Sequence, residues 1–199
     1  MHRNGDPIMR MHRQPKASHR FRYRSDGIRY LEESRKRPMT IELPVLTDCL
    51  TKSNQAFWIE CTILTTHSNP QHKVYIHQHE ISYNGQDAVQ NGLHSFRIPL
   101  TEEDIRSRRK IFRHLSIIKA LLNNYVYELT PYDTLIGVDH VYQYTIPNEH
   151  KLSKMKKAKQ FDREYHTDQY QIACELMIKQ NDRWSTTGVS CRTHVVSDN

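Results

Sequence analysis

The chain is poor in the residues that build nucleotide-binding loops and nucleophile motifs. Only six of its 199 residues are glycine, and it has neither a phosphate-binding loop with its lysine nor a Gly-x-Ser-x-Gly motif. No run of about 18 apolar residues is present that could span a bilayer, and the first residues lack the apolar stretch of a secretory signal. We therefore expect no enzyme, no cofactor and no membrane protein.

Cysteine is also scarce, and its spacing is wide. The four cysteines, Cys49, Cys61, Cys174 and Cys191, form no Cys-x-x-Cys pair. In a chain without a secretory signal they are most simply reduced thiols of a cytosolic or nuclear protein.

Histidine, in contrast, is abundant, with 13 residues. The densest groups are His67 with His72 and His77 with His79. Alternate residues of a strand, such as His77 and His79, can ligate zinc, but the sequence offers no third ligand at a characteristic spacing. We predict no metal site and expect surface histidines that titrate near neutral pH.

Positive charge is concentrated in the first fifth of the chain. Residues 1–40 hold eleven Lys or Arg and four Asp or Glu, a net charge of +7, which equals the formal net charge of the whole chain. This asymmetry indicates either a polyanionic partner or a solvated basic tail without a partner.

The most distinctive part of the basic segment is the string Arg-Phe-Arg-Tyr-Arg-Ser-Asp-Gly, which begins at Arg20. In an extended backbone alternate side chains share a face, so Arg20, Arg22 and Arg24 can point the same way. Phe21 then lies on the opposite face, where we expect it to be a core anchor. Arginine can bind guanine through two hydrogen bonds, and a carboxylate such as that of Asp26 can accept from cytosine N4. The string can therefore contact both phosphates and base edges.

The rest of the chain predicts mostly strands. Apolar residues alternate with a period of two in four stretches, residues 39–46, 56–65, 73–78 and 170–178. Turn signals lie between these stretches, among them Asn84-Gly85, Asn91-Gly92 and Asn181-Asp182. Several strands separated by turns, with little helix, suggest a β-sandwich.

Two segments predict helices, and two predict irregular structure. Thr101, followed three residues later by an acid, is typical of a helix N-cap, and apolar residues then recur at helical spacing up to Leu122. Residues 151–164 predict a second helix. Residues 1–18 show no periodicity, so we expect a disordered basic lead-in there. Residues 28–38 are charged and read as a surface loop.

The arginine string resembles the DNA-recognition loop of the Rel homology domain, the family of NF-κB, Dorsal and Relish. The usual family pattern is Arg-Phe-Arg-Tyr-x-Cys-Glu-Gly. The chain matches the first four positions from Arg20 and the glycine at Gly27, with Ser25 in place of the cysteine and Asp26 in place of the glutamate. Three further stretches are similar to core strands and to the Val-Val-Ser-Asp exit of the family, in family order: residues 56–74, 112–117 and 168–198.

The resemblance implies an all-β fold, an immunoglobulin-like β-sandwich. Residues 19–199 would form one Rel-type N-terminal DNA-binding domain with a helical insertion at about residues 119–165. The resemblance also implies that the segment from Phe112 to Ile117 is a strand, where apolar spacing alone indicates a helix.

The resemblance further implies roles for individual side chains. Arg20 and Arg22 would read guanines, Tyr23 would pack on backbone and base, and Asp26 would accept from a cytosine while bracing an arginine. Lys119 would substitute for family lysines at positions that Asn123-Asn124 occupy here. The expected DNA-binding residues are Arg20, Arg22, Tyr23, Arg24, Ser25, Asp26 and Lys119.

The function implied is that of a sequence-specific DNA-binding domain of a Relish/Dorsal-like transcription factor of innate immunity. It would bind κB-like sites in double-stranded DNA with G-rich half-sites, in the nucleus and the cytoplasm. Other Rel proteins or an inhibitory ankyrin-repeat protein are the expected protein partners. Because the family's dimerising second sandwich would begin after residue 199, we expect this chain alone to be monomeric.

A second interpretation stays open. The family's recognition-loop histidine is missing after Gly27, and two of its lysines are replaced at Asn123-Asn124. These departures favour a non-enzymatic interaction module on a Rel-like scaffold, a truncated regulator of full-length Rel proteins with weak DNA binding.

Overall fold

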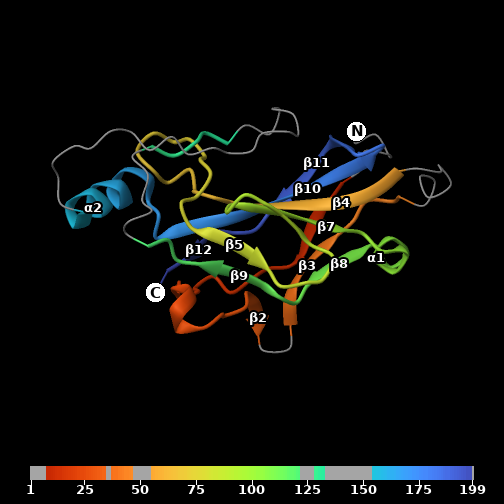
Figure 1. Cartoon of the computed structure of the whole chain (residues 1–199), viewed down its shortest axis with the longest axis horizontal. Coiled ribbons are helices and arrows are strands. Elements are labelled where there is room, and N and C mark those ends of the chain that lie inside the picture. Colours follow the sequence, from red (N-terminus) through yellow and green to blue (C-terminus); the bar gives the residue numbers. More distant parts are fainter. Residues whose placement is uncertain (1–7, 35–36, 47–54, 122–127, 133–153, 199) are drawn as a thin grey trace, which may run out of the picture.

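The computed structural model describes residues 8–34, 37–46, 55–121, 128–132 and 154–198. In these residues the chain is an all-β sandwich of antiparallel sheets with few helices (Figure 1). The elements in chain order are β1 (Arg10–Arg13), the 3-10 turn η1 (Arg24–Asp26), β2 (Glu32–Ser34), β3 (Arg37–Glu42), β4 (Gln55–Leu64), β5 (Glu80–Tyr83), β6 (Val89–Asn91), β7 (Ser95–Pro99), α1 (Glu102–Ser107), β8 (Arg109–Phe112), β9 (Leu115–Ile118), α2 (Lys154–Tyr165), β10 (Gln169–Gln180), β11 (Arg183–Arg192) and β12 (Val196–Ser197).

The two layers differ in size. The larger sheet has the order β11-β10-β4-β7-β6, and β12 pairs with the start of β10. In the smaller sheet β3 pairs with β1, β2 and β8. A separate ladder joins β5 to β9, with Glu80 opposite Ile118.

The core lies between these layers. Met39 and Ile41 of β3 and Phe112 of β8 are completely buried against Ile59 of β4 and Ile172 of β10. Because successive side chains of a strand point to opposite faces, the period-two pattern of the sequence directs one face of each strand inward. Each such buried side chain stabilises the fold by about 1.5–3 kcal/mol.

Three of the four predicted strands are confirmed, as β3, β4 and β10. The predicted strand at residues 73–78 is wrong. Only two isolated bridges form there, from Tyr75 to Pro131 and from Ile76 to Leu64. The segment places Val74 and Ile76 in a small apolar cluster with Leu64, so its apolar residues serve packing without a continuous ladder.

The predicted turn at Asn181-Asp182 is confirmed as a two-residue connection between β10 and β11. Both residues have positive φ, 49° and 61°, and Gln180 is paired with Arg183 across the turn. Asn and Asp tolerate this left-handed conformation, which suits the twist of a hairpin.

The helix expected from Thr101 to Leu122 is confirmed only in its first turns. Thr101 Oγ1 accepts a hydrogen bond from Asp104 N at 3.1 Å, but α1 ends at Ser107 and is capped by Arg108, whose φ is 53°. β8 and β9 follow, so strand structure replaces the helix as the resemblance implies, but a turn at Arg113-His114 divides the implied strand from Phe112 to Ile117 into two. The apolar residues beyond α1 are drawn into the sheets, where Phe112 and Leu115 are fully buried.

The insertion at about residues 119–165 is described only in part. The second predicted helix is confirmed as α2, and Phe161 and Tyr165 cluster with Tyr75 and Leu129. Of the other predicted positions in this insertion, Lys119 is described, whereas Asn123-Asn124 lie outside the described residues.

Two expectations about irregular segments are wrong. Residues 8–18 are part of the fold and not a disordered lead-in, because β1 pairs with β3 and Met9 is buried; residues 1–7 lie outside the described residues. The supposed loop at residues 28–38 contains β2 and the start of β3. Leu31 is buried within it and donates its N–H to Leu115 O at 2.7 Å. The domain therefore starts before residue 19.

No helix in the described part of the chain is long and apolar enough to cross a membrane.

Candidate nucleic-acid interface

The arginine loop, defined as residues 20–27, lies at one end of the sandwich where three distant segments meet. Lys119 N donates to Arg22 O at 2.8 Å, just beyond the end of β9. Phe21 N donates to Asp198 Oδ1 at 2.8 Å, just beyond β12. Figure 1 shows the turn η1 beside this C-terminal end. One backbone–backbone hydrogen bond and one hydrogen bond to the Asp198 carboxylate thus hold the loop in position on the fold.

The expected alternation of exposed and buried side chains is present only from Arg20 to Arg22. Beyond it Tyr23 is half-buried, Ser25 is exposed, and Arg24–Asp26 form the 3-10 turn η1, so the extended backbone expected there is wrong. Arg20, Arg22 and Arg24 are exposed, and Phe21 is buried. The Phe21 ring lies 5.2 Å from the Tyr170 ring, between centroids, so the prediction that Phe21 is a core anchor is confirmed. Anchoring of this kind keeps the loop attached to the core while the arginine side chains stay on the surface.

A tight turn closes the arginine loop. Asp26 N donates to Tyr23 O at 3.0 Å, and the Asp26 carboxylate accepts from Tyr23 N at 3.3 Å and from Ser25 Oγ at 3.3 Å. Gly27 follows with a φ of 83°, a region that side chains disfavour. Arg22 donates to the Asp26 carbonyl oxygen at 3.4 Å. The bracing of an arginine therefore uses the Asp26 main chain, while its carboxylate organises the turn.

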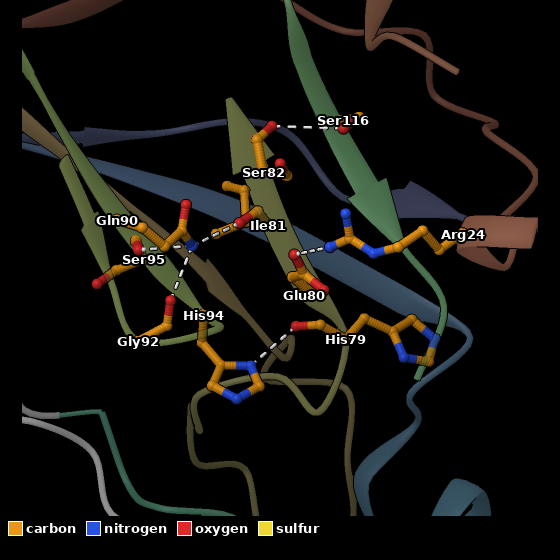
Figure 2. Close-up of polar contacts among 10 residues, drawn as sticks. All are labelled: Arg24, His79, Glu80, Ile81, Ser82, Gln90, Gly92, His94, Ser95 and Ser116. Carbon is orange, nitrogen blue, oxygen red and sulfur yellow. Dashed lines mark hydrogen bonds and ion pairs between the residues drawn. The ribbon is translucent and has the colours of Figure 1, made fainter. Parts of the chain in front are cut away.

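Two of the predicted cations are held by carboxylates. Arg24 forms an ion pair with Glu80 of β5 at 2.5 Å (Figure 2). Lys119 Nζ lies 3.4 Å from Asp198 Oδ2 and 5.9 Å from the centroid of the Tyr23 ring. The seven residues that the resemblance implies, five of them consecutive, are thus brought to one surface, but its positive charge is partly neutralised.

Further basic residues surround this surface. Burial, together with the positive charges of Arg29, Arg22 and Lys16 and against the opposing charge of Asp198, lowers the pKa of His19 to about 4. Arg29 and Lys16 therefore belong to the same positive cluster as Arg22. Sequence reasoning did not single them out, although the localised net charge of residues 1–40 was a signal for them.

Several histidines differ from the expected surface residues. His77, His79 and His94 are buried. Burial lowers the pKa of His77 to about 3, places that of His79 well below 6.5 and lowers that of His94. All three are therefore neutral at pH 7. His67 and His72 are exposed as expected, each with its Nδ1 within hydrogen-bond distance of the other's carbonyl oxygen.

No group of three side chains suited to a metal ion occurs in the residues that the structure describes. Cys61, Cys174 and Cys191 are free thiols on three adjacent strands, with Cys61 Sγ 3.7 Å from Cys174 Sγ. Cys49 lies outside the described residues.

Neither a known family model nor a curated protein matches this chain. The interpretation of the surface therefore depends on its own residues and on the resemblance of the arginine string.

Proposed function

We propose that the chain is the sequence-specific DNA-binding domain of a Rel/NF-κB-type transcription factor with an immunoglobulin-like sandwich. One observation supports this most strongly. The exposed arginine loop is hydrogen bonded to the Lys119 segment, far away in the sequence, by the Lys119 N–Arg22 O contact of 2.8 Å. A loop at the end of a sandwich that gathers cations from two segments is suited to a duplex.

The side chains divide by the chemistry they offer. Arg20 and Arg22 present planar guanidinium groups, each able to bind a guanine edge and contribute about 1–3 kcal/mol of base discrimination. Lys16, Arg29 and Lys119 surround them and suit phosphates, which set affinity without reading sequence. Double-stranded DNA with a G-rich, κB-like half-site is the proposed ligand, and other Rel proteins or an ankyrin-repeat inhibitor are the proposed protein partners in nucleus and cytoplasm.

A specific observation favours a second candidate, a non-enzymatic interaction module with weak DNA binding. The ion pairs Arg24–Glu80 and Lys119–Asp198 occupy two of the expected DNA contacts. DNA phosphates must compete with these carboxylates, so the affinity is reduced.

Fluorescence anisotropy with two labelled duplexes separates the candidates. One duplex carries a G-rich half-site and the other a scrambled sequence of the same composition, at about 50 and about 200 mM salt. The first candidate predicts tighter binding of the G-rich duplex at both salt concentrations. Equal binding of both duplexes favours the interaction module, and failure to bind either duplex at low salt contradicts the DNA-binding proposal.

A further inference from the structure

His79 lies between the two segments that form the candidate interface. Its ring packs edge-on against Phe21 of the arginine loop, with ring centroids 4.5 Å apart and an interplanar angle of 87°. Its Nδ1 accepts a hydrogen bond from the backbone N–H of Ala120 at 3.3 Å, next to Lys119. One imidazole therefore contacts both the loop and the Lys119 segment.

The rest of the surroundings holds this imidazole in place. His94 Nδ1 lies 2.9 Å from the carbonyl oxygen of His79, which Figure 2 shows together with the neighbouring Arg24–Glu80 pair. His79 N donates to Nδ1 of His77 at 3.1 Å, and the two rings are 4.7 Å apart. The His79 side chain is almost completely buried, so no solvent shell can stabilise a charge on it.

The charged groups near His79 disfavour a second proton. Lys119 repels this proton from beyond β9. His77, two residues earlier, and His94, in the β6–β7 turn, are neutral at pH 7 and repel it only when they are themselves protonated. Glu80, on β5, is engaged by Arg24, and Asp198, beyond β12, is engaged by Lys119. Tyr170 of β10 lies behind Phe21 and its raised pKa keeps it neutral.

We propose that His79, as a neutral imidazole, is a positioning residue that holds the arginine loop and the Lys119–Ala120 segment in one arrangement, and that a proton on His79 releases both. The consequence for DNA affinity rests on the proposed function; the positioning itself does not.

The mechanism follows from the hydrogen bond to Ala120. Protonated Nδ1 becomes a donor, which cannot accept the Ala120 N–H, and the new charge is repelled by Lys119. The released arrangement exposes His79 to water, where its pKa returns to about 6.5. Below that pH the docked arrangement is disfavoured by up to about tenfold per pH unit for this one group.

The direction in which DNA affinity changes with pH distinguishes this proposal from simple charge effects. Protonation of exposed histidines in general adds positive charge and strengthens binding to DNA as the pH falls. Release of the arginine loop by protonation of His79 instead weakens binding to DNA as the pH falls.

The test compares the full-length chain with two variants. His79→Asn keeps an acceptor near the position of Nδ1 but cannot take a proton. His72→Asn is the matched control, because His72 is exposed and its φ of 51° suits asparagine.

Affinity for the G-rich duplex is measured from about pH 7.5 to about pH 5 at constant ionic strength. We expect a loss approaching about tenfold per pH unit at the acid end for the native chain and His72→Asn, but not for His79→Asn. Stronger or unchanged native binding at pH 5, or the same loss in His79→Asn, overturns the proposal.

Hydrogen exchange without DNA gives an independent readout. We expect the amides of Phe21 and Ala120 to lose protection at acid pH in the native chain, while the amides of β4 and β10, which report global unfolding, stay protected. Undiminished protection of both amides overturns the proposal. Because this measurement uses the native chain, it stands even when His79→Asn fails to fold. If no duplex binds at pH 7.5, the proposed function fails, and the exchange measurement still decides the role of His79.

Discussion

At the scale of single residues, Ser25 gives the arginine loop a hydroxyl where the family pattern has a thiol. A thiol in so basic a loop has a lowered pKa and oxidises readily. The thiols in the described part of the chain lie outside this basic loop. Cys61 and Cys174 are buried, and the hydrogen bond with Cys174, together with burial, raises the pKa of Cys191.

We therefore expect mild peroxide to leave duplex affinity unchanged, as measured by anisotropy before and after treatment. The variant Ser25→Cys serves as the positive control and should lose affinity on oxidation and regain it on reduction. A reversible loss in the native chain would show that another cysteine controls binding.

At the scale of elements, α1 illustrates how a short helix depends on its cap. Thr101 Oγ1 accepts from Asp104 N at 3.1 Å, and Thr101 N donates to Asp104 Oδ2 at 2.9 Å, so each residue satisfies the other's backbone N–H. Asp104 also forms an ion pair with the buried Lys110 of β8 at 2.7 Å. The cap therefore connects the helix to the smaller sheet.

Thr101→Ala should lower the free energy of unfolding by about 1 kcal/mol, because it removes the side-chain acceptor of the cap. Urea denaturation followed by circular dichroism measures this change. Glu103→Gln, which alters an exposed side chain of the same helix, is the control and should change stability by no more than about 0.5 kcal/mol. Equal effects of the two substitutions would contradict the importance of the cap.

The elements also show which patterns in the sequence are informative. β4 and β10 are long strands of ten and twelve residues, and the alternation that the sequence shows over residues 56–65 and 170–178 predicted both. β1 has four residues, and its main buried neighbour, Met9, precedes it, so no periodicity could indicate it. The spacing of apolar residues after Thr101 fits a helix. The segment forms β8 and β9 instead because it pairs with β3 and β5, which are distant in sequence.

At the scale of the whole molecule, buried neutral histidines make the fold sensitive to acid. Burial lowers the pKa of His19 to about 4 and of His77 to about 3, and lowers that of His94. The unfolded chain takes up protons near pH 6.5, before the folded chain does, so stability is complete above about pH 6.5 and is lost below it. Burial raises the pKa of Asp162 and of Glu175, so these two carboxyl groups act in the opposite direction as the pH falls.

We expect the urea midpoint to fall between about pH 7 and about pH 5, with a contribution of up to about 1.4 kcal/mol per pH unit from His77 at the acid end. Urea titrations at several pH values and constant ionic strength measure it. A midpoint that is unchanged or higher at pH 5 would show that these histidines already carry protons in the folded chain.

The part of the candidate site that lies in one short stretch of sequence was predictable, whereas the part that the fold brings together from distant segments was not. The pattern from Arg20 to Asp26 indicated the exposed arginines and the buried Phe21. The role of His79 depends on Ala120 and Phe21, which approach it only in the folded chain. In the sequence His79 stands between Gln78 and Glu80, and nothing there indicates which backbone N–H its ring will accept.

The central claim is that the arginine loop reads bases, and comparing Arg22→Ala with Arg10→Ala tests it most directly. Arg22 lies in the loop, whereas Arg10 is an exposed arginine of β1. Arg22→Ala should weaken binding to the G-rich duplex by about 1–3 kcal/mol and barely change binding to the scrambled duplex. Arg10→Ala, if Arg10 meets only phosphate, should weaken both duplexes alike and reduce the salt slope by about one unit. The same uniform loss in both variants would contradict base reading and leave a basic interaction module.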